Sequence, residues 1–341
     1  MADRLADHTT LRLGGPAKDW VRATTEDALV DAVRRCDEAG EPVLVLAGGS
    51  NVVVADEGFA GTVVEVATTG VVADQDRDDP TSGGVVVTVA AGEPWDLFVA
   101  RAVENHWVGV EALSGIPGST GATPIQNVGA YGQEISQTLA SVRVWDRTLK
   151  GIRTFAAADC GFGYRTSRFK ADPGRHVVLD VTYRFRRGEL GAPVAYTELA
   201  RGLGVEPGGR TPLTEVRRTV LELRRAKGMV LDPGDHDTWS AGSFFTNPVV
   251  DAAAVPEGAP AWPQGDGVKT SAAWLIEHAG FGKGYGDGEA RLSTKHTLAL
   301  TNRGHATTAE LLDLAREIRD GVEQRFGIRL VNEPVLVGCE L

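Results

Sequence analysis

Apolar residues recur at helical spacing in several parts of the chain. The clearest case follows Thr25, a suitable N-cap before the acidic first turn of Glu26 and Asp27, and Gly40 and Pro42 would end that helix. Its apolar face would consist of Leu29, Ala32, Val33 and Cys36. The same spacing predicts helices over Pro94–Asn105 and Arg217–Arg225, and one on Leu311, Leu314, Ala315, Ile318, Val322 and Phe326.

Short β-branched runs between these helices predict strands. We expect them at Val43–Leu46, Val52–Ala55, Val85–Ala91, Ser141–Asp146, Val177–Arg184 and Arg329–Val337, the last returning to an earlier part of the chain. The polar stretch 71–84 reads as a solvated hairpin tip, and Pro233, Gly234 and Asp235 read as a linker. Helices and strands mixed in this way indicate an α+β protein.

The first glycine-rich turn argues against the usual dinucleotide-binding fold. Gly48-Gly49-Ser50 lies between two predicted strands, whereas in a Rossmann unit a helix follows the turn. No G-x-G-x-x-G follows a predicted strand, and no Walker A sequence is found. A Rossmann-type NAD dehydrogenase is therefore disfavoured.

Length and charge narrow the choice further. The chain has 341 residues, which predicts two or three domains, and its net charge of −11 argues against a nucleic-acid surface. An anionic substrate must then be met by local basic clusters. The N-terminal residues lack a secretory signal, and no window is apolar enough to span a membrane. Cys36, Cys160 and Cys339 have no metal-ligand spacing, so we expect free thiols in the cytoplasm and no bound metal.

The segment 116–132 (IPGSTGATPIQNVGAYG) is rich in glycine and has no charged residue. Glycine lets the backbone approach a ligand closely, and successive N–H groups can form a concave site for phosphate oxygens. Such a loop binds an anion without a lysine. The segment therefore predicts a phosphate-bearing ligand held through backbone amides.

Several motifs carry a resemblance to known families. The turn Leu46–Val54 resembles the flavin-phosphate turn of vanillyl-alcohol-oxidase-like FAD proteins. With the segments 116–132, Cys160–Phe169, Ala241–Pro248 and Asn332–Pro334, the whole chain resembles the UDP-N-acetylenolpyruvoylglucosamine reductase (MurB) family, type I subclass. The resemblance implies a two-part FAD-binding module plus a separate α/β substrate-binding domain. The expected division is 1–68 and 69–228 for the FAD-binding subdomains, 229–326 for the substrate-binding domain, and 327–341 for the returning strand.

The resemblance also implies ligand-binding residues. FAD would be held by Gly48, Gly49, Ser50, Asn51, Pro117, Gly118, Ser119, Gly121, Ala122, Gln126, Asn127, Gly129, Ala130, Tyr131 and Gly132. Neither glycine segment contains histidine or cysteine, so we expect non-covalent FAD. The UDP-sugar would be bound by Tyr164, Tyr196, Lys227, Asn247, Lys269 and His296, with Lys283 and Lys295 adding positive charge. A surface tyrosine is the less favoured alternative for Tyr196, because the resemblance places it in a loop that closes over substrate.

Three catalytic residues follow from the resemblance and not from the residues alone. From the sequence alone, Arg165 would be a surface or ion-pair residue, and Ser243 would lie in a buried strand or turn. Glu333 would be a solvated side chain. The resemblance implies that Arg165 binds the substrate carboxylate, to which a guanidinium fork is suited. It further implies that Ser243 protonates C2 of the enolpyruvyl group, and that Glu333 completes the catalytic trio.

The reaction implied by the resemblance is an NADPH-dependent reduction. NADPH passes hydride to FAD and leaves, and UDP-N-acetylglucosamine-enolpyruvate is then reduced in the same cleft to UDP-N-acetylmuramate, a peptidoglycan precursor. We expect a monomer with no nucleic-acid or membrane partner. Two alternatives remain: an FAD-dependent oxidase of the same superfamily acting on an alcohol or sugar, and a non-catalytic nucleotide-sugar or flavin-binding module.

Overall fold

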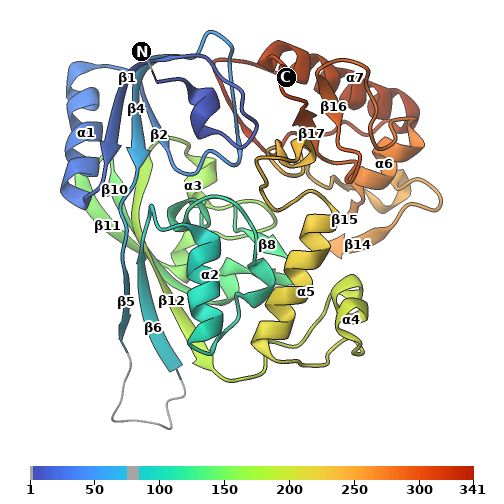
Figure 1. Cartoon of the computed structure of the whole chain (residues 1–341), viewed down its shortest axis with the longest axis horizontal. Helices are drawn as coiled ribbons and strands as arrows, with labels where there is room; N and C mark the ends of the chain where they lie inside the picture. Colours follow the sequence, from blue (N-terminus) through green and yellow to red (C-terminus); the bar gives the residue numbers. More distant parts are fainter. Residues whose placement is uncertain (1–2, 75–83) are drawn as a thin grey trace. The chain divides into compact units, whose positions relative to one another are not determined.

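The structure is a computed structural model that describes residues 3–74 and 84–341 (Figure 1). The chain forms two compact units that interleave along the sequence. Unit 1 consists of Met1–Ala17, Gly49–Phe59 and Ala226–Leu341, and unit 2 consists of Lys18–Gly48 and Ala60–Arg225. Mixed helices and sheets confirm the predicted α+β class, whereas the expected four-segment functional division stays a prediction.

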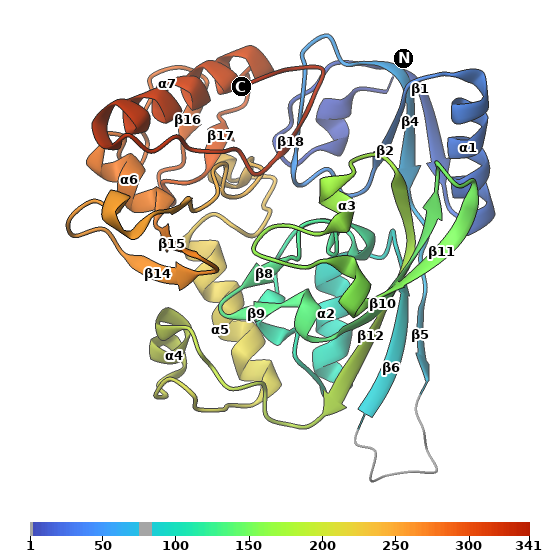
Figure 2. The same ribbon diagram turned by 180° about the vertical axis from the view of Figure 1, so that it is seen from behind.

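Unit 2 contains a large antiparallel sheet with the strand order β11-β10-β12-β6-β5, and β7 pairs with β12 (Figure 2). These strands are β5 (Val71–Asp74), β6 (Gly84–Ala90), β7 (Trp107–Val108), β10 (Leu139–Asp146), β11 (Gly151–Ala156) and β12 (His176–Arg187). The predicted strands at 85–91, 141–146 and 177–184 are thus confirmed with small shifts. Most of the predicted polar hairpin tip, residues 75–83, lies outside the described residues.

A second sheet of unit 2 has the order β1-β4-β2 and is joined to helix α1. Its strands are β1 (Ala17–Ala23), β2 (Val43–Leu46) and β4 (Phe59–Val66), with β2 and β4 parallel. Helix α1 (Glu26–Ala39) starts and stops as predicted, because the Thr25 side chain accepts a hydrogen bond from Ala28 N and Gly40 takes a left-handed conformation.

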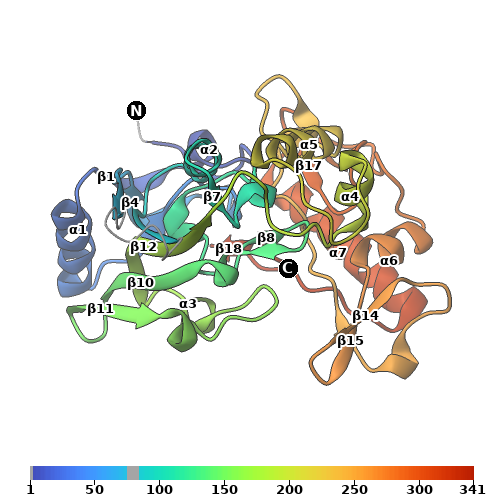
Figure 3. The same cartoon turned by 90° about the horizontal axis from the view of Figure 1, so that it is seen from below.

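The other elements of unit 2 are short or lie at its periphery. They are β8 (Gly129–Ala130), β9 (Gln133–Glu134), α2 (Trp95–Glu104), α3 (Arg168–Ala171), α4 (Thr197–Leu203) and α5 (Leu213–Ala226). Helices α4 and α5 lie side by side (Figure 3), with Leu199 and Ala200 of α4 in one buried cluster with Val216 and Val220 of α5. The predicted helix at 217–225 is thus the C-terminal part of α5.

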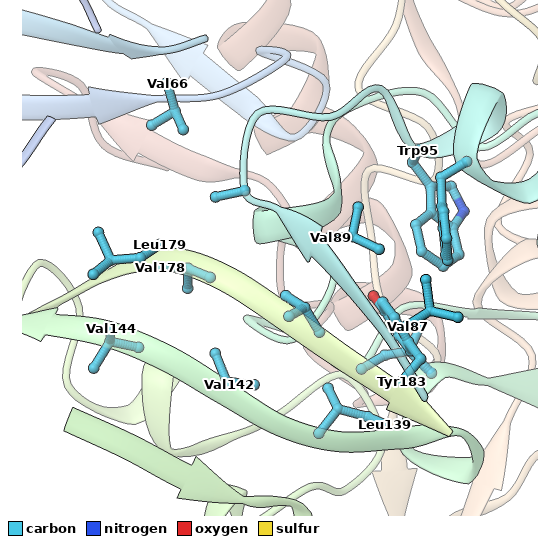
Figure 4. Packing of buried hydrophobic residues seen from close by; sticks show 14 of the residues in the cluster. Val66, Val87, Val89, Trp95, Leu139, Val142, Val144, Val178, Leu179 and Tyr183 are labelled. Carbon is cyan, nitrogen blue, oxygen red and sulfur yellow. The ribbon is translucent and has the colours of Figure 1, made fainter. Parts of the chain in front are cut away.

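The main core of unit 2 lies between the large sheet and α2. Tyr183 of β12 stacks on Phe98 with ring centroids 5.5 Å apart and packs beside Trp95, as Figure 4 shows for the labelled residues Trp95 and Tyr183. Burial of each such aromatic side chain contributes about 1.5–3 kcal/mol. The Tyr183 hydroxyl is hydrogen bonded to the Thr123 hydroxyl at 3.0 Å, so the core directly anchors the glycine-rich loop.

Unit 1 is built around α7 (Thr308–Phe326), which closes its core with α6 (Ala272–His278) and the strand pair β16 (Ala290–Leu292) and β17 (Leu300–Asn302). The predicted apolar face on Leu311, Ile318 and Val322 is buried. Thr307 and Glu310 form a capping box at its start. The remaining strands are β3 (Val52–Val54), β13 (Val249–Val250), β14 (Ala261–Gln264), β15 (Gly267–Thr270) and β18 (Val335–Val337).

The C-terminal segment returns to the N-terminal part of unit 1, where β18 pairs in parallel with β3. The predicted strand over Arg329–Val337 is wrong in length, because only Val335–Val337 is a strand. Pro334 interrupts the run, since proline has no N–H for a ladder hydrogen bond. The described part of the chain has no helix of the length and apolarity that a bilayer crossing requires.

Asp146 gives unit 2 a predictable dependence on pH. Asp146 accepts hydrogen bonds from Arg175, whose Nη2 lies 3.0 Å from the carboxylate, and from the backbone N–H groups of Thr148 and Leu149. These bonds outweigh the effect of burial and lower the pKa of Asp146 to about 2. The folded-state pKa is below the ordinary value of 3.8, so the stabilisation is present above that value and is lost as the pH falls through the folded-state pKa. At neutral pH it amounts to about 2 kcal/mol.

We expect urea unfolding at pH 6 and pH 3 to show a smaller loss of stability on acidification in Asp146→Asn than in the wild type. Asp31→Asn is the matched control, because Asp31 is exposed and pairs only across one helix turn with Arg34. It should keep the wild-type response. An Asp146→Asn protein with the wild-type pH response would contradict the assignment.

Candidate functional site

The two glycine-rich segments meet within unit 2 by backbone contact. A Cβ at Gly48 would lie 2.7 Å from Gly118 Cα, and one at Gly121 would lie 2.5 Å from the Ala91 Cβ. Gly118 O accepts a hydrogen bond from Trp95 N at 3.0 Å, and Gly121 N donates to Ala91 O at 2.8 Å. The loop is thereby fixed at a close approach that only glycine allows.

A second set of hydrogen bonds joins the glycine-rich loop to the segment that carries Arg165. The buried Asn127 donates from Nδ2 to Gly163 O at 3.2 Å, and Ser167 Oγ donates to Ile125 O at 2.6 Å. Arg165 Nη2 donates to Gly129 O at 2.9 Å. The structure therefore brings the predicted catalytic Arg165 next to predicted cofactor-binding residues of the same unit.

Arg165 lies in a tight turn with a strained backbone. Gly163 and Thr166 pair across the turn, and Arg165 has a φ of 51°. Its guanidinium carbon lies 5.7 Å from the centre of the Tyr164 ring. The backbone turn, the neighbouring Tyr164 ring and the hydrogen bond to Gly129 O therefore all restrain the Arg165 side chain. It is oriented before any ligand binds. Strain of this kind is often found at functional sites.

Tyr131 connects the end of the loop to the segment of Tyr196. Their rings meet edge to face with centroids 5.6 Å apart, although the Tyr196 side chain is 49% exposed. Burial raises the pKa of Tyr131 to about 12, and the nearby Arg224 guanidinium only partly opposes this. Tyr131 is consequently a neutral hydroxyl at physiological pH, able to donate a hydrogen bond.

Glu111 is a structural contributor that the sequence reasoning missed. Its carboxylate is fully buried and accepts hydrogen bonds of 2.6 Å from Gly109 N and from Ala192 N. It therefore ties the start of the Tyr196 segment to the residues that precede the glycine-rich loop. The sequence did contain a signal for this role, since Glu111 stands between the apolar residues Val110 and Ala112. A carboxylate that is buried in such a run needs dedicated hydrogen-bond partners.

Three motifs distant in sequence converge within unit 1. Glu333 N donates to Phe244 O at 2.8 Å, and Asn51 Nδ2 lies 3.5 Å from Glu333 O. Asn51 O in turn accepts from Val335 N at 3.0 Å. The predicted cofactor residue Asn51, the predicted catalytic Glu333 and the residue after Ser243 are therefore held together by hydrogen bonds.

Ser243 lies in an irregular, bent segment and in neither a strand nor an assigned turn. It follows Gly242, whose φ is 76°, and precedes the fully buried Phe244. Phe244 N donates to Leu298 O at 2.7 Å, and Thr246 N donates to Val331 O at 3.0 Å. The backbone on both sides of Ser243 is thus fixed while its side chain stays only partly buried.

The other predicted ligand residues are distributed over these two groups. Gly49 and Ser50 lie in unit 1, and a Cβ added at Gly49 would lie only 1.9 Å from His8 O. The predicted cofactor residues in unit 2 are Pro117, Ala122, Gln126, Ala130 and Gly132. In unit 1, Asn247 Oδ1 accepts from Ala272 N at the start of α6, and Lys269 Nζ lies 3.5 Å from Gln264 Oε1. Lys227 and His296 also belong to unit 1.

The segment 233–235 is not the predicted linker. Asp235 accepts a hydrogen bond from Asp237 N at 3.0 Å and forms an ion pair with Lys295. The positive charge that Lys295 was expected to add is therefore offset in part by Asp235. The short polar run looked like a linker because its ion-pair partner, Lys295, lies sixty positions later in the chain.

Comparison with known proteins places these motifs in one class. Residues 18–151 match the family model of the FAD binding domain, and residues 232–337 match the C-terminal domain model of UDP-N-acetylenolpyruvoylglucosamine reductase. The UDP-N-acetylenolpyruvoylglucosamine reductase of Cutibacterium acnes is 60% identical over 99% of this chain and 90% of its own length. That of Thermobifida fusca is 58% identical over 99% and 97%. The crystal structure of the Thermus caldophilus enzyme (MurB) superposes with a TM-score of 0.64 at 26% identity, covering 99% of this chain and 98% of that one.

The matched FAD binding domain and the observed fold define a FAD-dependent oxidoreductase with the vanillyl-alcohol-oxidase-like architecture. Within that class, the chain belongs to the UDP-N-acetylenolpyruvoylglucosamine reductase family. The resemblance drawn from the glycine segments and from the motifs around Arg165, Ser243 and Glu333 is confirmed at the level of the family.

The glycine-rich loop of unit 2 fits a phosphate-bearing cofactor. Among the described residues, none accepts from or donates to Ser119 Oγ, although this hydroxyl is buried. Ser119 precedes the short 3-10 helix Thr120–Ala122 but makes no cap hydrogen bond to it. A buried hydroxyl without a protein partner costs free energy unless a ligand or water bonds it. A diphosphate oxygen is a suitable acceptor.

We expect Ser119→Ala to weaken FAD binding about fivefold to tenfold, since about 1 kcal/mol is typical of one hydrogen bond. The melting temperature of the apoprotein should stay unchanged, because no internal hydrogen bond is lost. Fluorescence titration of apoprotein with FAD measures the first effect and calorimetry the second.

The control for Ser119 is Ser167→Ala, which removes a helix cap to Phe169 N and a hydrogen bond to Ile125 O. This change should lower stability by about 1–2 kcal/mol. Unchanged FAD affinity in Ser119→Ala would show that its hydroxyl does not face the cofactor.

Proposed function

We propose that the protein uses NADPH and tightly but non-covalently bound FAD to reduce the enolpyruvyl double bond of UDP-N-acetylglucosamine-enolpyruvate. The product would be UDP-N-acetylmuramate, a precursor of peptidoglycan. The observation that carries this proposal is the 60% identity to a reductase of this name over 99% of the chain. The motifs that hold Arg165, Ser243 and Glu333 support it.

When bound, FAD supplies the hydride-transfer chemistry. Its phosphates would be held by the backbone N–H groups of Gly48, Gly49 and Gly118, with Ser119 adding a hydroxyl. Pro117 and Gly121 would shape the loop, because proline has no N–H and the Gly121 N–H already donates to Ala91 O. Ser50 and Asn51, together with Ala122, Gln126, Asn127, Gly129, Ala130, Tyr131 and Gly132, complete the proposed cofactor-binding set. In this set Asn127 acts mainly by positioning, because its amide is already bonded to Gly163 O and to Glu134.

Arg165 would bind the carboxylate of the enolpyruvyl group. A guanidinium stays protonated through turnover and can therefore stabilise negative charge that develops on the carboxylate and C2. The bond from Nη2 to Gly129 O restrains one side of its fork. That restraint reduces the entropy lost when the substrate is oriented.

Ser243 would donate a proton to C2, with Glu333 polarising the substrate carboxylate. A serine hydroxyl is a weak acid, so this role requires a fixed donor geometry and neighbours that stabilise the alkoxide. The bend at Gly242 and the hydrogen bond between Glu333 N and Phe244 O support that geometry, because both hold the backbone adjoining the two side chains.

The UDP-sugar would be recognised by Tyr164, Tyr196, Lys227, Asn247, Lys269 and His296. Cationic and hydrogen-bonding side chains are needed to bind a diphosphate in a protein of net charge −11. We further propose that the protein works as a monomer in the cytoplasm. The free cysteines Cys36, Cys160 and Cys339 support a reducing compartment.

Visible spectroscopy of the purified protein tests the proposed function. We expect yellow protein whose flavin absorbance is bleached by anaerobic NADPH and is restored by anaerobic UDP-N-acetylglucosamine-enolpyruvate. Recovery by oxygen alone would instead identify an oxidase of the same superfamily. No flavin signal after incubation with FAD would overturn the cofactor assignment.

Replacement of Ser243 separates the two half-reactions. In Ser243→Ala we expect bleaching by NADPH at the wild-type rate, and reoxidation by substrate slowed by about a hundredfold to ten-thousandfold, the range typical of general acid catalysis. Stopped-flow absorbance measures both rates on one sample. Equal slowing of both would rule out the role as proton donor.

A further inference from the structure

Asp237 is a buried carboxylate with no part in the roles described above. It lies in the short 3-10 helix His236–Thr238 of unit 1 and is 4% exposed. Its Oδ1 accepts from Thr294 N and from Arg303 Nη1, both at 2.9 Å, and its Oδ2 accepts from the Thr294 hydroxyl at 2.5 Å. Both oxygens are therefore used in internal hydrogen bonds.

These bonds keep Asp237 ionised. Burial alone would raise its pKa, but the hydrogen bonds from the Thr294 hydroxyl and N–H, from Ser293 and from Arg303 outweigh burial and lower it. A buried carboxylate that remains charged binds its donors strongly, since hydrogen bonds to an ionised group are about twice as strong as neutral ones. Thr294 is thus firmly anchored to Asp237 through both its N–H and its hydroxyl.

Thr294 belongs to the turn 293–297, which contains His296. The Ser293 hydroxyl accepts from Lys295 N at 3.0 Å and from His296 N at 3.3 Å, so the turn is also ordered internally. At its far end, the Thr297 hydroxyl donates to Glu277 Oε1 at 2.5 Å. The backbone N–H of His296 is bonded to Ser293, the residue next to Thr294, so the anchored Thr294 and the ordered turn restrain His296 together.

The other face of Asp237 contacts the turn that carries Lys227. A Cβ added at Gly228 would lie 2.9 Å from the Asp237 backbone oxygen and 3.3 Å from its side-chain Cβ. Gly228 has a φ of 66°, which suits glycine at such a close approach. Asp237 therefore touches the Lys227-Gly228 turn with its main chain and the 293–297 turn with its carboxylate.

We propose that Asp237 is a positioning residue for binding the diphosphate of the UDP-sugar. Its carboxylate, through Thr294, would hold the turn of His296, and its main chain would hold the turn of Lys227. This inference rests on the proposed function, from which the ligand chemistry is taken. Asp237 would not touch the ligand, because its carboxylate is buried and both of its oxygens are used in internal hydrogen bonds. Its charge is instead directed inward, to Arg303 and to the donors of Thr294.

The test uses holoenzyme and two kinds of change. Asp237→Asn retains the shape but removes the charge. Thr294→Val removes the hydroxyl donor, and Thr294→Ser retains it as the matched control. A second control is Asp313→Asn, at an exposed carboxylate paired with Arg316 on α7. For each variant, calorimetric titration with UDP gives Kd, and steady-state kinetics with UDP-N-acetylglucosamine-enolpyruvate give KM and kcat.

We expect Kd for UDP and KM to rise about tenfold in Asp237→Asn and in Thr294→Val, equivalent to about 1.4 kcal/mol. The kcat value and the flavin content should stay within about twofold of wild type. Thr294→Ser and Asp313→Asn should keep wild-type Kd and KM. A general structural defect would instead lower kcat and flavin content together.

The inference is overturned if Thr294→Val binds UDP as tightly as Thr294→Ser, or if kcat and flavin content fall while KM is unchanged. Should Asp237→Asn not fold, the Thr294 pair still decides the question. Failure of the proposed function would appear separately, as wild-type protein that does not reduce the enolpyruvyl substrate.

Discussion

The constraint on which the glycine-rich loop of unit 2 depends is the close contact between the backbones of Gly48 and Gly118. A single methyl group at residue 48 would lie 2.7 Å from Gly118 Cα, so the two loops can meet only if no side chain is present there. Much of the site depends on this contact. Gly118 is bonded to the start of α2, and Asn127 and Ser167 connect the same loop to the turn of Arg165. The loop thus transmits one backbone restraint to the residues that would face the cofactor and the substrate carboxylate.

Buried carboxylates serve the same purpose in both units. Glu111 in unit 2 and Asp237 in unit 1 each accept backbone N–H groups from a segment far along the chain, Ala192 and Thr294. Irregular segments have N–H groups that no regular element satisfies, and a buried carboxylate has two oxygens that can accept them. The residues that we propose to face the ligand stand on such irregular segments. The two buried acids would position them without touching the ligand.

Local pattern predicted the regular elements well and the site only in part. Helix α1 was recognisable from Thr25 to Gly40, because its cap, its apolar face and its stop are all local. The glycine segments and the motifs of Arg165, Ser243 and Glu333 sufficed to identify the family. The supposed linker at 233–235 and the overlong C-terminal strand were wrong, since Lys295 and the break at Pro334 determine those segments. The bond between Asn51 and Glu333 spans 282 positions, and no periodicity encodes such a pairing.

The parallel pairing of β3 with β18 has a consequence for protein synthesis. All of unit 2 has been translated once residue 225 is made, whereas unit 1 also needs Val335–Val337 to cover the buried Val52–Val54. Domains generally fold as units during synthesis, and unpaired strand edges invite aggregation. On the ribosome, β3 must therefore wait without its parallel partner until Val335–Val337 has been made. Cells that produce this protein rapidly would need chaperones mainly to shield the early segment of unit 1 that carries β3, Gly49–Phe59.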